Sequence, residues 1–389
     1  MKILVINSGS SSLKYTLFKF PEQISLLNGL FENIGTDATI HHLQWGTQKK
    51  IKQPLPLADH KQALLCLLQT IKQQHSFKTI NLVAHRVVHG GEKFKQPSLM
   101  NATNLAELEQ LSPLAPLHNP ANSLGIKILL QQLPAIKHIA VFDTAFHATL
   151  PDYAYRYPVP NDWYQQHKIR RYGFHGSSHA YVAKQAALML NKPLNHLNII
   201  SLHLGNGASA CAIQNGISID TSMGFTPNEG LMMGTRSGDI DTAIYPYLQA
   251  QTDLSITEID GLLNNASGLK AIASTNDLRE VHKLIAAKDS KAKLAFAMLC
   301  YRIKKYIGAY YAVLGHLDAL IFTGGMGEND AELRAKCCEN LAGLGLKIDI
   351  DKNQAHDDCI QAPEMNISIL VIQTNEELEI AQQAHAIIN

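Results

Sequence analysis

A turn rich in glycine and serine near the start of the chain has the residue types that bind phosphate. The run Asn7-Ser-Gly-Ser-Ser-Ser-Leu-Lys14 follows four apolar residues and leads into a second strand-like pattern, Leu13 to Phe18. Gly9 lets the backbone approach a ligand closely, the serines add short hydrogen-bond donors, and Lys14 adds a cation. Such a hairpin suits the terminal phosphate of a nucleotide, with Asn7 near its metal ion. The alternative is an ordinary serine-rich hairpin.

A second turn of the same design lies near mid-chain. Residues 198–213 again combine an apolar strand pattern, a turn of small residues with Gly205 and Gly207, and another strand pattern. Two such hairpins about half a chain apart predict two related halves, which together could hold a polyphosphate. Neither is a P-loop, and the nearest lookalike, Gly230-Leu-Met-Met-Gly-Thr-Arg, has the wrong spacing and no lysine.

Candidate anion-binding and orienting residues follow two predicted strands. Residues 79–84 form an apolar run that ends at His85-Arg-Val-Val-His-Gly-Gly91, which makes Arg86 a candidate anion ligand. Asp143 follows a second run, residues 138–142, and is placed to orient a metal or an arginine. The alternatives are a surface arginine for Arg86 and a helix N-cap for Asp143.

The second half contributes a histidine and another arginine. His175 and His179 have the spacing of a zinc motif, but Gly176 stands where a zincin needs glutamate, so we favour His175 as a donor to a phosphoryl oxygen. Arg236 lies in an irregular stretch, residues 220–241, with four glycines and three aspartates, and is the second candidate anion clamp. A third glycine turn, residues 323–329, follows a strand pattern and predicts a phosphate or nucleoside contact.

Alternating strand and helix patterns must position these residues. Weak strands are expected over residues 24–56, and the closing segment should be a strand, residues 367–373, and a helix capped by Asn375-Glu376-Glu377. Residues 151–160 are non-periodic and predict a crossing between domains. Helices are expected over residues 59–74, 102–111, 121–132, 242–250, 277–287 and 291–314, and another is expected to follow residues 170–179 and to end at about residue 190. Further strands are expected over 138–142 and 319–322.

Length and composition favour a globular protein of two domains. The chain has 389 residues, of which 46% are hydrophobic and 17% charged. Lys and Arg total 34 against 33 Asp and Glu, a balance that argues against binding to nucleic acid or a membrane surface. The six cysteines form no Cys-x-x-Cys pair, and no signal peptide or membrane span is evident, so we expect a cytoplasmic protein with reduced thiols.

Several of these motifs together resemble the acetate kinase family, from residue 3 to about 385. The matching segments are residues 7–14, 85–91, 142–147, 172–176, 203–207, 230–241 and 374–377. The resemblance implies the actin/Hsp70/sugar-kinase fold, an α/β fold with two duplicated, ribonuclease H-like domains around an ATP cleft. It further implies an N-terminal kinase domain, residues 1–148, joined by the closing helix 376–389, a C-terminal nucleotide-binding and dimerisation domain, residues 149–375, and a homodimer.

The same resemblance implies a reversible transfer of the ATP γ-phosphoryl group to acetate, giving acetyl phosphate and ADP, in a step linked to acetyl-CoA metabolism. Asp143, His175, Arg236 and Arg86 would be catalytic, and Asn7 and Glu376 would hold Mg²⁺ or Mn²⁺. Arg86, Val88, Leu117, Phe174 and Pro227 would bind the small acid. ATP would be bound by Lys14, His203, Leu204, Gly205, Asn206, Gly207, Asp277, Leu278, Arg279, Gly325, Met326, Gly327, Glu328 and Asn329.

These residue types suit that chemistry. A carboxylate is ionised at neutral pH, because carboxylic acids titrate near pH ~4, so it needs no general base. The barrier is repulsion between two anions, which arginines, a histidine and Mg²⁺ would lower. Asp143 is therefore expected to orient Arg86 or a metal-bound water rather than to remove a proton.

Three positions depart from the family pattern, and two alternative functions remain. Lys270-Ala271 stands where a more glycine-rich run is usual, which bears on the preference among nucleotides. Asn228 and Ala148 adjoin predicted site residues, where they could tune the choice of acid. The closest alternative is a propionate or butyrate kinase, although Val88 favours the smaller acid because a β-branched side chain narrows the pocket. A more distant alternative is a non-transferring ATPase of the actin/Hsp70 type.

Overall fold

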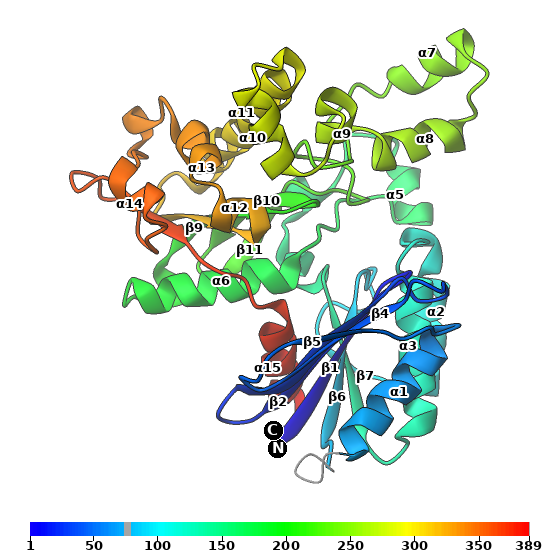
Figure 1. The fold of residues 1–389 in the computed structure, drawn as a ribbon. Helices are drawn as coiled ribbons and strands as arrows, with labels where there is room; N and C mark the ends of the chain where they lie inside the picture. Colours follow the sequence, from blue (N-terminus) through cyan, green and yellow to red (C-terminus); the bar gives the residue numbers. More distant parts are fainter. Residues whose placement is uncertain (74–78, 389) are drawn as a thin grey trace. The chain divides into compact units, whose positions relative to one another are not determined.

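The chain forms two compact units, each built around its own β-sheet. The structure, a computed structural model, describes residues 1–73 and 79–388 (Figure 1). Unit 1 comprises Met1–Phe146 and Asn375–Asn389, and unit 2 comprises His147–Thr374. Each unit is described by itself below.

Unit 1 contains a mixed sheet in the order β5-β4-β3-β2-β1-β6-β8-β7. The hairpin of β1 and β2 is antiparallel, whereas β1, β6 and β8 are parallel to one another. Its strands are β1 (Lys2–Ser8), β2 (Leu13–Lys19), β3 (Ile24–Glu32), β4 (Ile40–Trp45), β5 (Ile51–Pro54), β6 (Leu82–Val87), β7 (Ser98–Leu99) and β8 (Lys137–Phe142).

Both faces of β1 are buried, because its side chains alternate between two cores. Leu4 and Ile6 pack in one core with residues of α1 (His60–Gln73) and α3 (Asn119–Gln132). Ile3 and Val5 pack in the other with residues of the closing helix α15 (Glu376–Ile388). This double burial explains the continuous apolar run of β1 and fixes the hairpin turn at the end of the strand. Unit 1 also contains α2 (Ala102–Gln110) and the 3-10 turn η2 (Ser112–Leu114), while η3 (Ala145–Thr149) spans the boundary between the units.

Unit 2 repeats the central strand arrangement of unit 1. Its sheet has the order β11-β10-β9-β12-β13, in which the β9–β10 hairpin is antiparallel and β9, β12 and β13 are parallel. This matches β3-β2-β1-β6-β8 of unit 1 strand for strand. The strands are β9 (Asn198–Leu204), β10 (Ala208–Gln214), β11 (Ile217–Thr221), β12 (Ala319–Thr323) and β13 (Ser368–Val371).

The helices of unit 2 cover its sheet, with α6 packed on β9 and β12 and the long α11 packed on β10 and β9 (Figure 1). The helices are α4 (Asp152–Tyr155), α5 (Asn161–His167), α6 (Gly176–Met189), α7 (Ile244–Gln251), α8 (Ile256–Asn265), α9 (Gly268–Ala273), α10 (Leu278–Ala286), α11 (Ser290–Leu314), α12 (Gly324–Asn329), α13 (Ala331–Cys338) and α14 (Ile350–Gln354). Two 3-10 turns, η4 (Leu194–His196) and η5 (Ala342–Leu344), complete the unit.

The structure corrects three expectations from the sequence. The strand expected over residues 79–84 is β6, Leu82–Val87, so Arg86 lies inside the strand rather than after it. Residues 151–160, expected to be irregular, contain the short helix α4, and no prediction covered α5, α8, α9 and α14. Residue 74, at the end of a predicted helix, and residue 389 of the closing helix lie outside the described residues. Among the described residues, no helix is long and apolar enough to cross a membrane.

Candidate functional site

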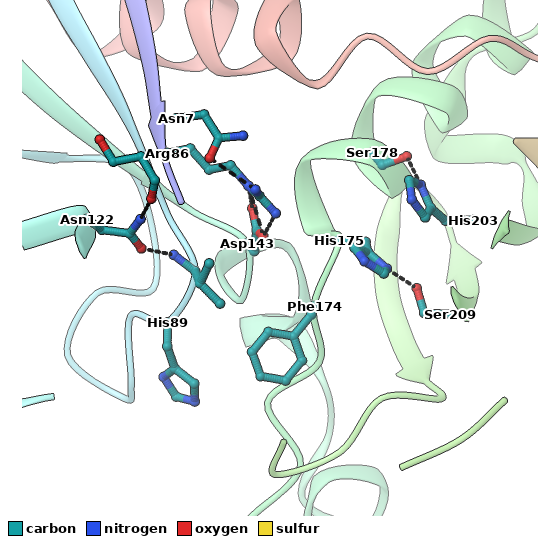
Figure 2. A network of polar contacts seen from close by, with 12 residues as sticks. Asn7, Arg86, His89, Asn122, Asp143, Phe174, His175, Ser178, His203 and Ser209 are labelled. Carbon is teal, nitrogen blue, oxygen red and sulfur yellow. Dashed lines mark hydrogen bonds and ion pairs between the residues drawn. The ribbon is translucent and has the colours of Figure 1, made fainter. Parts of the chain in front are cut away.

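In unit 1, Asp143 holds the Arg86 guanidinium at the ends of two parallel strands. β6 and β8 pair so that Arg86 stands opposite Val141, and the chain turns just after this point at Asp143. Arg86 Nε donates to Asp143 Oδ1 at 3.1 Å, and Nη2 donates to Oδ2 at 2.6 Å (Figure 2). A bidentate contact of this kind fixes both the position and the plane of the guanidinium.

The charges around this pair keep the guanidinium protonated. Burial lowers the pKa of Arg86, but Asp143 and Glu376 raise it more, so that the net shift is upward. Burial raises the pKa of Asp143, which is 1% exposed, and the Arg86 charge opposes that change. Because the contact is short and bidentate, we take the pair as ionised.

Asn7 contacts the same guanidinium, and two acidic residues of α15 lie in the same unit. Asn7 Oδ1, at the end of β1, accepts a hydrogen bond from Arg86 Nη1 at 3.2 Å. Glu376, in the first turn of α15, has a pKa raised by burial, and the Arg86 charge opposes that change. Lys14 forms an ion pair with Glu377 Oε1 at 2.5 Å, and its contact with ATP stays a prediction.

Asn122, which the sequence did not single out, links the ends of β1 and β6. Its Oδ1 accepts from Val88 N at 3.0 Å, and its Nδ2 donates to Ser8 O at 2.7 Å (Figure 2). Val88 is almost fully buried, whereas Leu117, predicted to share its pocket, is 68% exposed on unit 1. The only sequence signal for Asn122 was a polar residue on the buried side of a helical pattern.

In unit 2, His175 and Arg236 come together at the glycine turn of the β9–β10 hairpin. The turn is closed by a hydrogen bond from Gly205 N to Gly207 O at 3.0 Å. A Cβ atom at Gly207 would lie 3.3 Å from Arg236 Nη1 and 3.5 Å from His175 Nε2. A side chain at position 207 would be tight against Arg236 Nη1 and in ordinary contact with His175 Nε2, so glycine leaves more room for a ligand at this turn.

Arg236 is a half-buried cation without an acidic partner in the described part of the chain. Its Nη1 makes only long contacts, to Pro227 O at 3.4 Å and to the Met233 sulfur at 3.8 Å. Burial lowers its pKa, as expected for a charge that lacks a counter-ion. Such a guanidinium is suited to an anionic ligand.

Histidines and hydroxyls line the neighbouring part of the hairpin. The His175 and His203 rings stack with centroids 4.3 Å apart. His203 Nδ1 lies 2.7 Å from Ser178 Oγ, which also contacts Thr374 Oγ1 at 2.8 Å (Figure 2). His175 itself adopts a left-handed backbone, with φ 57°, at the N-cap of α6. An unfavourable backbone conformation at such a residue is typical of functional sites. Phe174, from the predicted acid pocket, is buried beside it and accepts a hydrogen bond from His147 Nε2 at 2.9 Å through its carbonyl.

A cavity of about 860 Å³ in unit 2 brings together most of the predicted nucleotide contacts. It is lined by Gly205, Asn206, Asp277, Leu278, Arg279, Gly325, Met326 and Asn329 from the predicted set, and by Asn276, His282, Asp330, Ala331, Glu332, Gln354 and His356, which the sequence did not indicate. His203, Leu204, Gly207, Gly327 and Glu328 do not line it. Glu328 instead accepts hydrogen bonds from Gly324 N at 2.9 Å and Thr374 N at 3.1 Å.

The repeated sheets and the solved structures that resemble this chain define the actin/Hsp70/sugar-kinase-like fold. A propionate kinase from Francisella tularensis has a TM-score of 0.94 at 43% identity, with 98% of each chain covered. An acetate kinase from Porphyromonas gingivalis has a TM-score of 0.93 at 39% identity, with 100% of each chain covered.

Sequence comparison narrows the class to one family. The model of the Acetokinase family matches residues 2–382, and the chain belongs to that family. An acetate kinase from Campylobacter lari is 47% identical over 98% of each chain. The predicted fold and family are thereby confirmed, while the roles of the individual site residues stay predictions.

Proposed function

We propose that this chain is an acetate kinase, which transfers the γ-phosphoryl group of ATP to acetate and catalyses the reverse reaction. The observation that carries the proposal is the similarity over nearly the whole chain to proteins named acetate kinase. The local geometry of each unit supports the chemistry, as argued below.

Unit 1 offers a cation for the carboxylate substrate. Arg86 is fixed in plane by Asp143 and lies next to the Asn7 amide oxygen. A guanidinium that is already oriented binds a carboxylate with little loss of side-chain freedom. Because acetate is ionised at neutral pH, Asp143 has no proton to remove, and its role in this proposal is to position Arg86.

Unit 2 offers groups for the phosphates. The cavity provides a nucleoside site, and the glycine turn beside it lies next to Arg236 Nη1 and His175 Nε2. In phosphoryl transfer, little covalent chemistry falls to the protein, and catalysis rests on positioning and on neutralising charge. Arg236 and His175 would stabilise the charge that spreads over the moving phosphoryl group.

The residues at the end of β1 and the start of α15 fit a Mg²⁺ ion. Although no cluster of three metal-binding carboxylate, thiol or imidazole groups exists among the described residues, Mg²⁺ usually keeps several waters and takes one or two carboxylates. Asn7 Oδ1 and the Glu376 carboxylate are hard oxygen ligands of this kind. When bound, the ion would neutralise phosphate charge.

The choice between acetate and propionate is decided by a small apolar pocket in this proposal. Val88, Leu117, Phe174 and Pro227 are its proposed lining, and the similar Francisella protein is named a propionate kinase. One methylene in such a pocket is worth about 1–3 kcal/mol, so overlapping specificity is expected. We predict that Val88→Ala shifts the ratio of kcat/KM for propionate to that for acetate upward by about tenfold, which is measurable by parallel steady-state assays. A ratio that stays constant would remove Val88 from the pocket.

The direct test is to trap the acyl phosphate. The protein is incubated with ATP, Mg²⁺ and acetate, propionate or butyrate, and hydroxylamine converts any acyl phosphate to a hydroxamate. We expect the highest kcat/KM with acetate. Release of phosphate from ATP without hydroxamate would instead indicate a non-transferring ATPase, and a preference for a longer acid would indicate a propionate or butyrate kinase.

A cytoplasmic homodimer completes the proposal. The long helix α11 exposes apolar side chains, among them Tyr301, which is 63% exposed, and Val313, which is 52% exposed. Exposed apolar residues on one long helix are suited to an interface with a second copy of the chain. Analytical ultracentrifugation of the purified protein would distinguish a dimer from a monomer.

A further inference from the structure

Behind His175 lies a line of buried polar side chains that the proposed chemistry does not use. His175 Nδ1 lies 2.9 Å from Ser209 Oγ on β10 (Figure 2). The same Ser209 oxygen lies 2.8 Å from His179 Nε2 on α6, and His179 Nδ1 lies 2.9 Å from Ser201 Oγ on β9. Ser201, Ser209 and His179 are fully buried. The order along this hydrogen-bonded line is therefore Ser201, His179, Ser209 and His175.

Along this line of side chains, the hydrogen bonds can be donated in only two consistent directions. Burial, with His147 and His203 close by, lowers the pKa of His179 well below its usual range, so the ring is neutral and one of its two nitrogens carries a proton. If that nitrogen is Nε2, His179 donates to Ser209, and the Ser209 hydroxyl is left to donate to His175 Nδ1. If it is Nδ1, His179 donates to Ser201, and the Ser209 hydroxyl donates back to His179.

Ser201 decides between the two directions. Within the described chain, the Ser201 hydroxyl makes no side-chain hydrogen bond other than the one with His179 Nδ1. In the first direction Ser201 donates to that nitrogen, and every buried proton in the line has an acceptor. In the second direction the Ser201 hydroxyl proton is buried without an acceptor, which costs free energy. The first direction is therefore the more stable one.

We propose that Ser201, His179 and Ser209 hold His175 in the neutral tautomer that carries its proton on Nε2. This nitrogen is the one that lies beside Gly207 and Arg236, 3.5 Å from the position of a Cβ at residue 207. The inference rests on the proposed function, in which His175 donates to the phosphoryl group. Ser201, His179 and Ser209 are positioning residues, since they act through His175.

This arrangement has a chemical advantage next to Arg236. A histidine can donate from Nε2 either as the imidazolium or as the neutral Nε2–H tautomer. An imidazolium beside the Arg236 guanidinium would be disfavoured by repulsion between like charges. Because Ser209 donates to Nδ1, the neutral His175 ring carries its proton on Nε2. His175 can therefore donate a hydrogen bond without adding a positive charge next to Arg236.

Nitrogen NMR tests the proposal directly on the protein as it exists. The full chain is labelled with ¹⁵N,¹³C-histidine, the His175 ring is assigned by comparison with His175→Gln, and the ring nitrogens are recorded at pH 7.5 without nucleotide. We expect a pyrrole-type Nε2 and a pyridine-type Nδ1 for His175. A protonated Nδ1, or equal populations of the two tautomers, would overturn the proposal even if the chain is an active acetate kinase.

Variants then link the tautomer to the reaction. Ser209→Ala should shift the His175 tautomer toward Nδ1–H and lower kcat at least tenfold, with the KM for ATP changed less than threefold. Ser209→Thr, which keeps a hydroxyl, should retain part of the wild-type tautomer population of His175 and part of the wild-type kcat. Ser123→Ala is the matched control, because Ser123 is buried in unit 1 and its hydroxyl has no partner in the described chain. A Ser209→Ala protein that is folded and keeps the wild-type tautomer would overturn the proposal. If instead the wild-type protein transfers phosphate to none of the acids tested, that result would count against the proposed function alone.

Discussion

At the scale of single residues, the structure distinguishes two arginines that look alike in the sequence. Arg86 is oriented by a buried carboxylate, whereas Arg236 has no acidic partner in the described chain. A guanidinium already paired with a carboxylate is suited to hold a small anion in one orientation. An unpaired one is better suited to a polyanion whose charge changes during the reaction. The two arginines are therefore expected to respond differently to substitution.

We predict that Asp143→Asn lowers kcat/KM for acetate by about 100-fold and leaves the KM for ATP within about twofold. Asparagine keeps the shape of the side chain but loses the charge that fixes Arg86 through two short contacts. Steady-state kinetics over a range of pH and Mg²⁺ concentration would measure this, with the exposed Asp152→Asn as control. Loss of one ionisation from the pH profile, with unchanged affinity for Mg²⁺, would show instead that Asp143 transfers a proton.

At the scale of elements, the sequence predicted the hairpins and most helices because their apolar spacing is local information. It placed β6 too early because its boundaries depend on pairing with β1 and β8, which no local pattern contains. Asn122, Ser201 and Ser209 were missed as site residues for a related reason. The role of a polar residue in a buried helix or strand depends on its hydrogen-bond partner, and for these residues that partner lies on another element.

Hydrogen bonds between Gly230 and Asp239 join the two ends of the segment that carries Arg236. A local sequence pattern could not have predicted these hydrogen bonds either. Asp239 Oδ1 accepts from Gly230 N at 2.8 Å, and Asp239 N donates to Gly230 O at 3.0 Å. The other carboxylate oxygen, Asp239 Oδ2, accepts from Tyr306 OH on α11 at 2.8 Å. The long helix α11 therefore holds Asp239, which in turn joins the two ends of the loop that carries Arg236.

We predict that Tyr306→Phe lowers kcat by about three- to tenfold without unfolding the protein. Removing the hydroxyl leaves one Asp239 oxygen without its donor, so the Arg236 loop loses part of its anchorage. Tyr153→Phe on α4, where the side chain is 89% exposed, is the control. A double variant with Arg236→Lys should show less than the sum of the two effects on log kcat, because both changes act through one guanidinium. Full additivity would separate Tyr306 from Arg236.

At the scale of the whole molecule, both units contain buried histidines that are kept neutral by the fold. Burial lowers the pKa of His41 and His89 in unit 1, and of His147 in unit 2, from 6.5 to about 4. His41 Nε2 lies 2.7 Å from Tyr15 OH and its ring stacks on Phe31, while His147 Nδ1 lies 2.8 Å from Ser218 Oγ. These rings serve packing and hydrogen bonding rather than proton transfer in the folded state.

The stability of the protein should therefore fall in mild acid. Above pH 6.5 the histidines are neutral in both the folded and the unfolded chain, and they contribute no pH dependence. Between about pH 6.5 and 4 the unfolded chain binds protons that the folded chain does not, so the free energy of unfolding decreases as the pH falls. Each of the three residues contributes on the order of 3 kcal/mol at most, since one pKa unit corresponds to about 1.4 kcal/mol. Below about pH 4 their contribution levels off.

Urea unfolding at pH 7.5, 6.0 and 5.0 would measure the decrease in the free energy of unfolding. The variant His41→Gln isolates the contribution of His41 to that decrease. Glutamine does not titrate and retains an acceptor for Tyr15, so the variant should lose less stability than the wild type between pH 7.5 and 5.0. The exposed His167→Gln is the matched control and should follow the wild type. If His41→Gln shows the same loss as the wild type, His41 is not the buried neutral group described here. An increase in wild-type stability toward pH 5.0 would contradict the whole argument, because protons would then bind preferentially to the folded chain.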